Sequence, residues 1–503
     1  MLATTFSCAH EGVEGYLVRV EARVTTGLPK LTIVGLPDTA VREGSERVRS
    51  AIRATVDSFP LGRVVVNLSP ASRRKIGAAL DLPVAVAVLC AGGACKEERL
   101  ADTVLIGELG LDGTVHGVSG ALPTALCAAR HGFRRLLVPR ANATEAAVSG
   151  GINVFPVATL AEALALLEGS IAPKPTRVDV RSLFDGDGFP SAIDLSEVRG
   201  QAAARRALEI AAAGSHHLLM IGPPGAGKTM LARRLPTILP PLTLKEAIET
   251  TSIHSVAGLT TGGLITRRPF RAPHHTTSSA GLVGGGIVPR PGEVSLAHHG
   301  VLFLDELPEF SPVVLNQLRE PLEDKRLTIS RAGGRLTFPA DVMLVAAMNP
   351  CPCGYYGTSV RACGCPESAI VRYRARVSGP LLDRIDLYVE VPRLEFEEIS
   401  SGQCSERSAD VRRRVVAARR LKDQKRRSSG VAAPADEGAR KLLARAVDRL
   451  GLSARAVSRV VRVAETIALL AGRTEVEAGD IAEALAYRPP ASMAAGADAA
   501  VLP

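Results

Sequence analysis

The chain has 503 residues, 46% of them hydrophobic and 22% charged, with no tryptophan and a net charge of +10. This length is too great for one ordinary domain, and the composition is that of a globular protein with an aliphatic core. No apolar run reaches the roughly 18 residues that a membrane-spanning helix needs, and the N-terminal MLATTFSCAHEG lacks the basic and apolar regions of a signal peptide. We therefore expect a cytoplasmic protein with no membrane partner, whose nine cysteines stay reduced.

The positive charge is concentrated in one part of the chain. Residues 401–460 contain 16 Lys/Arg and 6 Asp/Glu, so this window alone carries +10, the net charge of the whole chain. Such a local excess favours a local anionic partner, and nucleic acid is the leading candidate. An ordinary solvated helix face is the alternative interpretation.

Residues 1–170 are predicted to form one α/β domain. Short apolar runs bounded by glycine or proline indicate strands, and the patterns between them indicate helices. The expected strands cover 30–37, 63–70, 103–109 and 135–139, and the expected helices include 39–55 and 120–133. Residues 171–194 are rich in Pro, Gly and Asp, which predicts a linker.

An α/β core is predicted for residues 195–395, and residues 396–490 show helical patterns only. These helical patterns cover 407–427, 436–450, 453–472 and 475–488. The tail, 491–503, is expected to be flexible. The predicted fold class is therefore multidomain α/β with an all-helical C-terminal domain.

The stretch HLLMIGPPGAGKTM, residues 217–230, carries the strongest functional signal. An apolar strand leads into a glycine-rich loop and a helical pattern follows, which is the context that a phosphate-binding P-loop requires. Glycines let backbone N–H groups converge on phosphate oxygens, and the helix N-terminus adds partial positive charge. We expect Lys228 to reach the β- and γ-phosphates of ATP and Thr229 to ligate Mg²⁺. The predicted nucleotide-binding residues are Gly222, Pro223, Pro224, Gly225, Ala226, Gly227, Lys228, Thr229 and Met230.

Two later apolar runs end in polar residues that suit the same chemistry. In GVLFLDELPEF, residues 300–310, four apolar residues precede Asp305 and Glu306. We expect Asp305 to hold Mg²⁺ and Glu306 to polarise the attacking water. In DVMLVAAMNP, residues 341–350, the run ends in Asn349, whose side chain can hydrogen-bond the γ-phosphate or the water.

In this order, GPPGAGKT, LFLDE, MNPC and SGPLLDRID resemble the motifs of AAA+ ATPases. Longer stretches are similar to magnesium-chelatase-like ATPases of the ComM/YifB type: residues 198–229, 267–286 and 291–310 in the core, and GLPKLTIVGLPDTAVREGSERVRSAI (27–52) and NLSPASRRKIGAALDLPVAVAVL (67–89) before it. The resemblance covers almost the whole chain.

The resemblance implies an assembly and two further nucleotide-sensing residues. It implies a homo-oligomeric ring, expected to be a hexamer, with ATP between subunits. In SGPLLDRID, Arg384 occupies the place of the finger that reaches a neighbour's γ-phosphate. In LSARAVSRVV, Arg455 stands where a second sensing arginine is expected, with Arg459 as the alternative. A surface salt bridge is the other interpretation of each arginine.

The resemblance also implies a fold similar to the Lon protease domain for residues 1–170. Ala79 and Leu122 fall near the positions of the catalytic serine and lysine of that domain. Neither residue can act as a nucleophile or a base, so we expect a scaffold without peptidase activity.

For function, the resemblance implies an ATP-driven DNA motor, with helicase activity in branch migration, that acts with recombination proteins on incoming DNA. Fold alone does not fix function. A chelatase-like or MoxR-like ATPase that remodels a protein partner is therefore the main alternative. A nucleotide-dependent scaffold with little turnover is a third.

Two basic segments bear on this choice. KRLTISRAGGRLTFPAD, residues 325–341, predicts a β-hairpin with Arg331 and Arg335 beside its tip, where they could contact a DNA backbone. VRRRVVAARRLKDQKRR, residues 411–427, places nine basic residues in seventeen on a predicted helix. Few aromatics accompany them, so we expect salt-dependent, sequence-indifferent binding to single-stranded or branched DNA. Solubilising charge is the alternative for both segments.

Four cysteines stand close together in NPCPCGYYGTSVRACGCP, residues 349–366. Cys351, Cys353, Cys363 and Cys365 could hold a structural Zn²⁺, which would leave no position for catalysis. Free thiols and a redox switch are the alternatives.

Paired histidines and a glycine-rich stretch lie between the P-loop and Asp305. We expect His274, His275, His298 and His299 to hydrogen-bond near the nucleotide or within the insert before Asp305 rather than to bind a metal, because adjacent residues of an extended segment point to opposite faces. Residues 278–292 predict a mobile loop.

Overall fold

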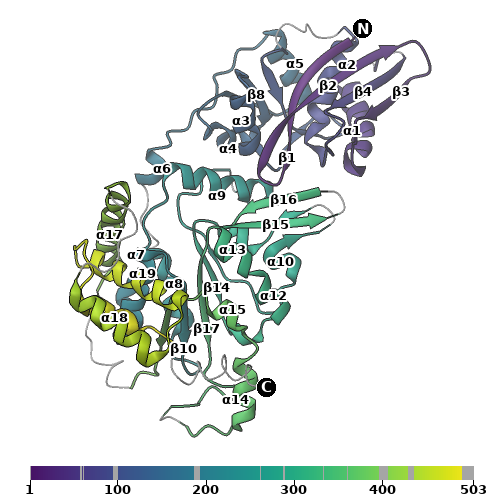
Figure 1. Ribbon diagram of the computed structural model, residues 1–503. Helices are drawn as coiled ribbons and strands as arrows, with labels where there is room; N and C mark the ends of the chain where they lie inside the picture. Colours follow the sequence, from purple (N-terminus) through teal and green to yellow (C-terminus); the bar gives the residue numbers. More distant parts are fainter. Residues whose placement is uncertain are drawn as a thin grey trace. The chain divides into compact units, whose positions relative to one another are not determined.

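The computed structural model describes residues 2–56, 59–60, 62–93, 100–185, 193–260, 262–286, 289–331, 334–358, 361–395, 406–428 and 436–489. The predicted tail, 491–503, and part of the predicted linker, 186–192, lie outside these residues. The chain forms two compact units (Figure 1): unit 1 comprises residues 1–186, 243–266 and 289–291, and unit 2 comprises residues 187–242, 267–288 and 292–503.

Unit 1 is built on a seven-stranded mixed sheet in the order β3-β4-β2-β1-β5-β8-β9. The strands β1 and β2 form an antiparallel hairpin, β2 also pairs antiparallel with β4, and the remaining pairs are parallel. The strands are β1 (Leu2–Glu11), β2 (Glu14–Thr25), β3 (Lys30–Val34), β4 (Arg63–Ser69), β5 (Thr103–Leu105), β8 (Arg135–Pro139) and β9 (Asn153–Val157), with a small ribbon of β6 (Glu108–Leu109) and β7 (Val115–His116). The helices are α1 (Thr39–Val56), α2 (Asp81–Ala91), α3 (Ala121–Arg130), α4 (Ala143–Ala147), α5 (Leu160–Glu168), α6 (Ser182–Asp185) and α9 (Leu244–Val256).

Both faces of this sheet are covered by helices. Along β8, Leu137 packs into one core with α1, α2 and α5, whereas Leu136 and Val138 pack into a second core with α3 and α4. Side chains of a strand alternate between faces, so a continuous apolar run in a strand predicts burial on both sides. All eleven residues of α2 are buried. A helix that is apolar on every side, as α2 is from Leu82 to Ala91, is expected to lie in the core.

A buried carboxylate holds the segment 243–266 in unit 1. From its place in the sequence, this segment was predicted to belong to the α/β core of residues 195–395. Glu145 is 1% exposed and accepts hydrogen bonds from the Leu122 N–H at 3.0 Å and the Thr260 hydroxyl at 3.0 Å. The Ser255 hydroxyl also donates to it, and the Gly120 N–H donates to the Ser255 carbonyl at 3.1 Å. These bonds join α3 and α4 to the α9 segment.

Unit 2 contains a five-stranded parallel sheet in the order β11-β14-β17-β10-β18. Figure 1 shows β14, β17 and β10 running side by side. The strands are β11 (Phe270–Arg271), β14 (Val301–Leu304), β17 (Met343–Met348), β10 (Leu218–Ile221) and β18 (Leu387–Glu390). All residues of β10, β14 and β17 are buried, as continuous apolar runs in a parallel sheet predict. A mixed α/β architecture with this parallel sheet fits a fold of the AAA+ type, as the resemblance implies.

The remaining elements of unit 2 are helices, a short strand and a hairpin. The helices before β18 are α7 (Ala202–Gly214), α8 (Lys228–Ile238), α10 (Ser279–Val283), α11 (Glu293–Leu296), α12 (Pro312–Gln317), α13 (Arg319–Asp324), α14 (Glu367–Arg374) and α15 (Gly379–Leu382). Those after it are α17 (Ser408–Ser428), α18 (Glu437–Leu450), α19 (Ala454–Leu470) and α20 (Ala478–Ala486). The strands β15 (Arg326–Arg331) and β16 (Gly334–Pro339) form the predicted hairpin, and β12 covers Gly284–Gly285.

The C-terminal helices share one hydrophobic core with the parallel sheet. Val411 and Val415 of α17 and Val463 of α19 are buried together with Leu218 of β10. A charged cluster reinforces this packing, because Glu209 of α7 accepts from Arg206 at 3.0 Å and from Arg414 of α17 at 2.6 Å, and Arg206 also pairs with Glu483 of α20 at 2.8 Å. These helices therefore belong to the same compact unit as the P-loop strand.

One expected loop has regular structure. Within the glycine-rich residues 278–292, Ser279–Val283 forms the short helix α10, and the Ser278 side chain accepts from the Gly281 N–H at 3.2 Å. Serine at the N-cap satisfies an amide that the first turn leaves unpaired. The prediction of a loop was wrong for these residues. Across the described parts of the chain, no helix has both the length and the apolar character needed to cross a membrane.

We expect Glu145→Ala to loosen the α9 segment. The substitution leaves the donors of Leu122, Ser255 and Thr260 without their acceptor, and each buried unsatisfied group costs about 1–3 kcal/mol. Hydrogen exchange of the amides in 244–256 should accelerate in this variant, whereas Glu168→Ala, at an exposed position of α5, should leave it unchanged. Equal exchange in the two variants would contradict this role.

Candidate functional site

The P-loop leaves β10 with its glycines in conformations that other residues rarely adopt. Gly225 has φ of 77° and Gly227 has φ of 90°, in the left-handed region that favours glycine. Gly222 is required for a different reason, since a Cβ there would lie 2.1 Å from the Val391 carbonyl oxygen at the end of β18. Helix α8 begins directly after Gly227, as the strand–loop–helix prediction requires.

Lys228 lies under this loop and is 8% exposed. Its Nζ donates to the carbonyl oxygens of Gly222 at 2.6 Å and Pro223 at 3.0 Å, and to Oδ1 of Asn349 at 3.1 Å. Burial lowers the pKa of Lys228, and the negative charges of Asp305 and Glu306 oppose that shift. The structure therefore brings Lys228 and Asn349 together from α8 and the end of β17.

The carboxylates after β14 reach the same place. The Thr229 hydroxyl donates to Oδ2 of Asp305 at 2.6 Å, and Oδ1 of Asp305 accepts from the Glu306 N–H at 3.0 Å. Hydroxyl and carboxylate oxygens are ligands that Mg²⁺ prefers, so these two side chains fit a magnesium ion. Glu306 has φ of 52°, unusual for a residue with a side chain, and its side chain is 56% exposed.

Two further residues lie beside this cluster: His275, for which hydrogen bonding was expected, and Gln201, which had no role assigned from the sequence. His275 Nδ1 lies 3.5 Å from Oε2 of Glu306, and the His275 ring packs edge-on against Phe310. Gln201 donates to the Pro392 carbonyl at 2.6 Å and to the Ala226 carbonyl of the P-loop at 3.4 Å. Pairing of His275 with an acid could not be read from the sequence, because the two residues are separated by most of the insert before β14.

The second histidine pair lies elsewhere in unit 2. His298 Nδ1 accepts from the Asp341 N–H at 2.9 Å, and the His299 N–H donates to the Asp341 carbonyl at 2.8 Å. His274 Nδ1 lies 2.9 Å from the Thr276 hydroxyl. Each pair therefore takes part in local hydrogen bonds.

Arg384 is apart from the P-loop contacts. Its Nη1 donates to the Pro380 carbonyl at 2.6 Å, and its Nη2 pairs with Glu323. The Arg384 Nε is buried and makes no hydrogen bond within the described structure. The side chain also lines an open hollow of about 430 Å³ with Asn316, Gln317 and Glu323.

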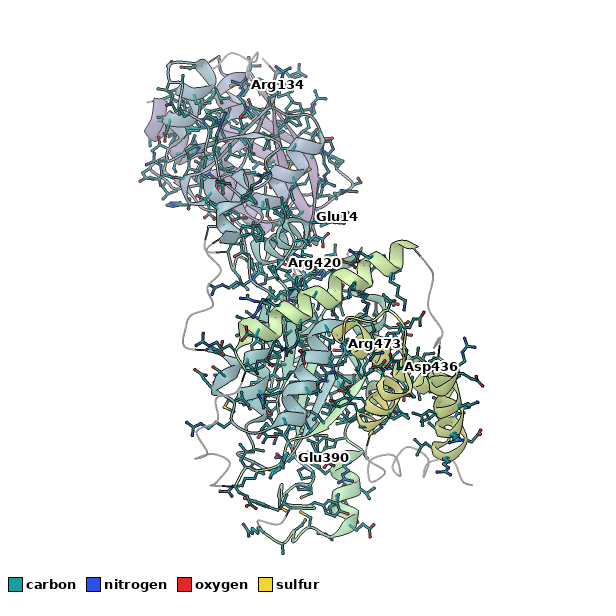
Figure 2. All side chains as sticks on the ribbon, turned by 90° about the vertical axis from the view of Figure 1, so that its left-hand side faces the viewer. Glu14, Arg134, Glu390, Arg420, Asp436 and Arg473 are labelled. Atoms are coloured by element: carbon teal, nitrogen blue, oxygen red, sulfur yellow. The ribbon has the colours of Figure 1, made fainter. Side chains whose placement is uncertain are left out.

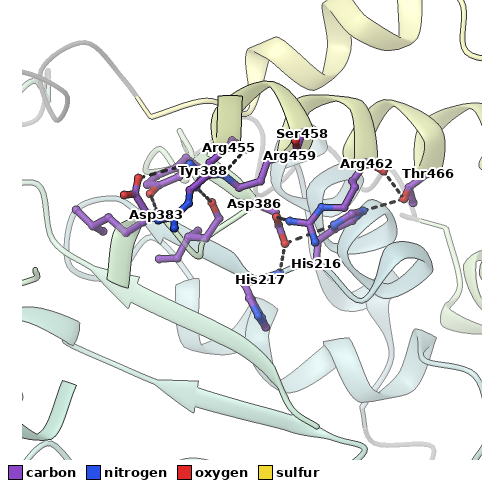
Figure 3. Close-up of polar contacts among 12 residues, drawn as sticks. His216, His217, Asp383, Asp386, Tyr388, Arg455, Ser458, Arg459, Arg462 and Thr466 are labelled. Atoms are coloured by element: carbon purple, nitrogen blue, oxygen red, sulfur yellow. Dashed lines mark hydrogen bonds and ion pairs between the residues drawn. The ribbon is translucent and has the colours of Figure 1, made fainter. Parts of the chain in front are cut away.

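The two candidate sensing arginines of α19 differ in their surroundings (Figure 3). Arg455 is exposed. Arg459 is 6% exposed, and its guanidinium donates to the Ile385 carbonyl at 3.2 Å and lies 3.5 Å from Oδ1 of Asp383. Arg459 therefore holds α19 against the segment that contains Arg384, whereas Arg455 remains accessible.

One turn after Arg459, α19 makes a second contact, with the buried Asp386. Asp386 accepts from Arg462 at 2.9 Å and from the His217 N–H at 3.2 Å, and His216 joins Asp386 at 3.5 Å to the Thr466 hydroxyl at 2.8 Å (Figure 3). Burial by itself would raise the pKa of Asp386, but the His216 hydrogen bond and the nearby positive charges hold it below its ordinary value. The network ties α19 to the starts of β10 and β18.

The basic helix α17 uses part of its charge within its own unit. Arg419 donates to the Ala212 carbonyl at 2.6 Å, and Lys425 donates to the Thr474 carbonyl at 3.1 Å. Arg420, labelled in Figure 2, is exposed on the same helix. The side chains of residues 426–428 lie outside the described structure, as does that of Arg331 in the hairpin, whereas Arg335 is described and exposed.

Comparison with known families covers most of the chain. The model described as "Magnesium chelatase, subunit ChlI" matches residues 194–399. Those described as "Subunit ChlI of Mg-chelatase" and "Magnesium chelatase, subunit ChlI C-terminal" match residues 20–142 and 405–488.

Individual relatives match over nearly their full lengths. Competence protein ComM of Haemophilus influenzae is 42% identical in an alignment of 500 positions that covers 97% of each chain. The chain belongs to the magnesium-chelatase-like ComM/YifB family. The uncharacterized protein YifB of Escherichia coli is 42% identical in an alignment of 491 positions that covers 95% of each chain. An uncharacterized protein of Mycobacterium tuberculosis H37Rv is 44% identical in an alignment of 505 positions that covers 97% of this chain and 98% of that one.

The family assigns a general chemistry to the fold. Its members are AAA+ ATPases that use ATP and Mg²⁺, as expected from the resemblance. A partial likeness connects the chain to Lon protease 2 of Bacillus subtilis, which is 31% identical in an alignment of 152 positions that covers 27% of this chain and 26% of that protein.

We expect Arg459→Met and Arg455→Met to have separable effects. Loss of the Arg459 guanidinium leaves the buried Ile385 carbonyl without its donor, at a cost of about 1–3 kcal/mol, whereas an exposed substitution changes stability by about 0.5 kcal/mol or less. Calorimetry should show a lower unfolding temperature for Arg459→Met only. Arg455→Met should lower ATP turnover in a folded protein. Destabilisation by Arg455→Met, or a stable Arg459→Met, would contradict this assignment.

Proposed function

We propose that the chain hydrolyses ATP at the P-loop of unit 2 and uses the energy to move DNA through a ring of identical subunits. The observation that supports ATP hydrolysis best is the convergence of Lys228 and Thr229 at the start of α8 with Asp305 and Asn349, which follow the neighbouring parallel strands β14 and β17. Parallel strands that end at the same edge of a sheet place such residues in one crevice.

Each of these side chains has a distinct role in the proposed reaction. Lys228 binds the β- and γ-phosphates, and its carbonyl and amide partners hold the ammonium in place. Thr229 and Asp305 would hold Mg²⁺, which neutralises negative charge on the phosphate oxygens when it is bound. Glu306 orients and polarises the attacking water, with His275 as its neighbour. Asn349 donates its amide N–H to the γ-phosphate.

A single subunit lacks one part of this set. Arg384 has its polar contacts with Glu323 and Pro380 rather than with its own P-loop. An always-charged planar guanidinium that lines an open hollow suits a γ-phosphate held by a neighbouring subunit. We therefore propose that ATP lies between subunits and that Arg384 acts across the interface of a hexamer.

Charge and family support DNA as the substrate. Residues 401–460 carry the whole net charge of the chain, and Arg335 and Arg420 are exposed. One relative carries the name competence protein ComM. On this basis we propose backbone-directed binding of single-stranded or branched DNA, with branch migration in recombination as the outcome. Arg419 and Lys425 contribute less to binding, because they pack α17 onto its own unit.

Unit 1 is proposed to serve as a scaffold. Through the resemblance to the Lon protease domain, Ala79 and Leu122 fall near the positions of its catalytic serine and lysine, and Leu122 is 0% exposed. Neither side chain carries a nucleophile or a proton acceptor. We propose that unit 1 has no peptidase activity and supports the assembly of the ring.

Glu306→Gln should separate binding from hydrolysis. The amide keeps the size of the side chain but cannot polarise water, so we expect ATP affinity to remain and turnover to fall about 10²–10⁴-fold. A fluorescent ATP analogue measures binding, and phosphate release measures turnover. Lys228→Ala, by contrast, should lose both. Normal hydrolysis by Glu306→Gln would remove Glu306 from the mechanism.

Single-stranded or four-way-junction DNA should stimulate ATP turnover, and affinity should fall steeply as salt rises. Arg335→Ala should weaken binding to every DNA sequence and flatten the dependence of log affinity on log salt. Lys245→Ala removes the same charge from an exposed site on α9, outside the basic residues 401–460, and serves as the matched control. Turnover that responds only to a protein partner would favour the remodelling ATPase instead.

A further inference from the structure

The loop that follows β17 has almost no apolar packing of its own. Among its described residues between 351 and 365, only Cys351 and Gly354 are buried. The cysteines are nevertheless drawn together: the sulfurs of Cys351 and Cys353 lie 3.3 Å apart, and each lies 3.6 Å from that of Cys363. With Cys365, all four sulfurs lie within 4.8 Å of one another. Something other than hydrophobic burial must order this loop.

The sulfur separations fit a tetrahedral metal ion. Four thiolates about 2.3 Å from zinc place their sulfurs about 3.8 Å from one another. A disulfide needs about 2.05 Å, and all four cysteines are free. Two backbone N–H groups point at sulfurs, from Tyr356 to Cys351 at 3.3 Å and from Cys365 to Cys363 at 3.4 Å. Outer hydrogen bonds of this kind orient metal ligands.

We propose that Cys351, Cys353, Cys363 and Cys365 bind one structural Zn²⁺, and that this ion fixes the wall of the nucleotide site. Four thiolates fill a tetrahedral shell, so the ion has no open position for catalysis. Thiolate ligands select zinc over magnesium, which prefers oxygen ligands.

The turn that follows Cys353 packs directly against the P-loop. Gly354 has φ of +85°, and a Cβ there would lie 2.5 Å from Cδ of Pro224 and 3.8 Å from Cγ of Asn349. Only glycine permits both this backbone conformation and this close approach. The position of Pro224 therefore depends on a loop that the metal would hold.

A second contact joins the loop to the lysine of the P-loop. Arg374 of α14 donates to the Pro350 carbonyl at 3.1 Å, and its guanidinium lies 5.2 Å from the centre of the Tyr356 ring. Pro350 follows Asn349, whose Oδ1 accepts from Lys228. The free energy of metal binding stabilises the ordered conformation of the loop. Loss of zinc should therefore loosen the contacts that hold Pro224 and Asn349 in place.

Elemental analysis of the untagged full-length protein tests the metal site. We expect about one zinc per chain. Cys363→Ser/Cys365→Ser should lose it, and Cys90→Ala, which removes a thiol buried in α2, should keep it. A wild-type chain that carries no zinc, or carries iron in its place, would overturn the proposal, as would zinc that persists in the double variant.

Hydrogen exchange of the wild-type protein, before and after extraction with a zinc-selective chelator, tests the connection to the nucleotide site. Amides of 225–229 and 349–358 should exchange at least about tenfold faster after extraction, and those of α2 should not change. Zinc loss without faster exchange at 225–229 would disprove the connection. This connection rests on the proposed nucleotide site, but the zinc content does not, so a zinc-containing protein without ATPase activity would refute the proposed function alone.

Discussion

The buried ammonium group of Lys228 is the contact on which the rest of the proposed nucleotide site depends. A charged group in the interior must be paired or hydrogen-bonded, and here two P-loop carbonyls and the Asn349 amide oxygen satisfy it. That requirement draws the loop back over the start of α8 and fixes β10 beside β17. Thr229, the next residue, is thereby directed at Asp305. One buried charge thus sets the positions of both phosphate-binding and magnesium-binding groups.

A second charged network fixes the helical part of unit 2. Asp386 has its carboxylate satisfied by Arg462, His216 and the His217 N–H, so α19 is attached to the starts of β10, the strand that leads into the P-loop, and of β18. Arg459 holds the neighbouring residues 383–385. Arg384 lies within that segment, between two anchored neighbours. Movement of α19 would therefore be transmitted to the arginine that we propose for the neighbouring subunit's ATP.

Much of the fold and of this site could be predicted from the sequence, because the relevant signals are local. Short apolar runs that end in the glycine-rich loop or in a polar residue identified β10, β14 and β17, and the hairpin and the four C-terminal helices follow from turn glycines and helical spacing. Other features depend on tertiary packing. Arg455 and Arg459 lie one turn apart, and only the docking of α19 buries one and exposes the other. The helix α10 depends on a serine cap within a glycine-rich stretch, and the Glu306–His275 contact joins residues far apart in the chain.

The bonds of Glu145 to Ser255 and Thr260 have a consequence for the way this protein is divided. Unit 1 is assembled from pieces on both sides of the P-loop in the chain, so it is not a contiguous module. A fragment that stopped at residue 186 would expose the carboxylate and the surface of α3 that α9 covers. Gene segments encoding the two units could not be exchanged between relatives at a single junction. The segments that form unit 1 alternate along the chain with those that form unit 2, so any one junction would divide a unit.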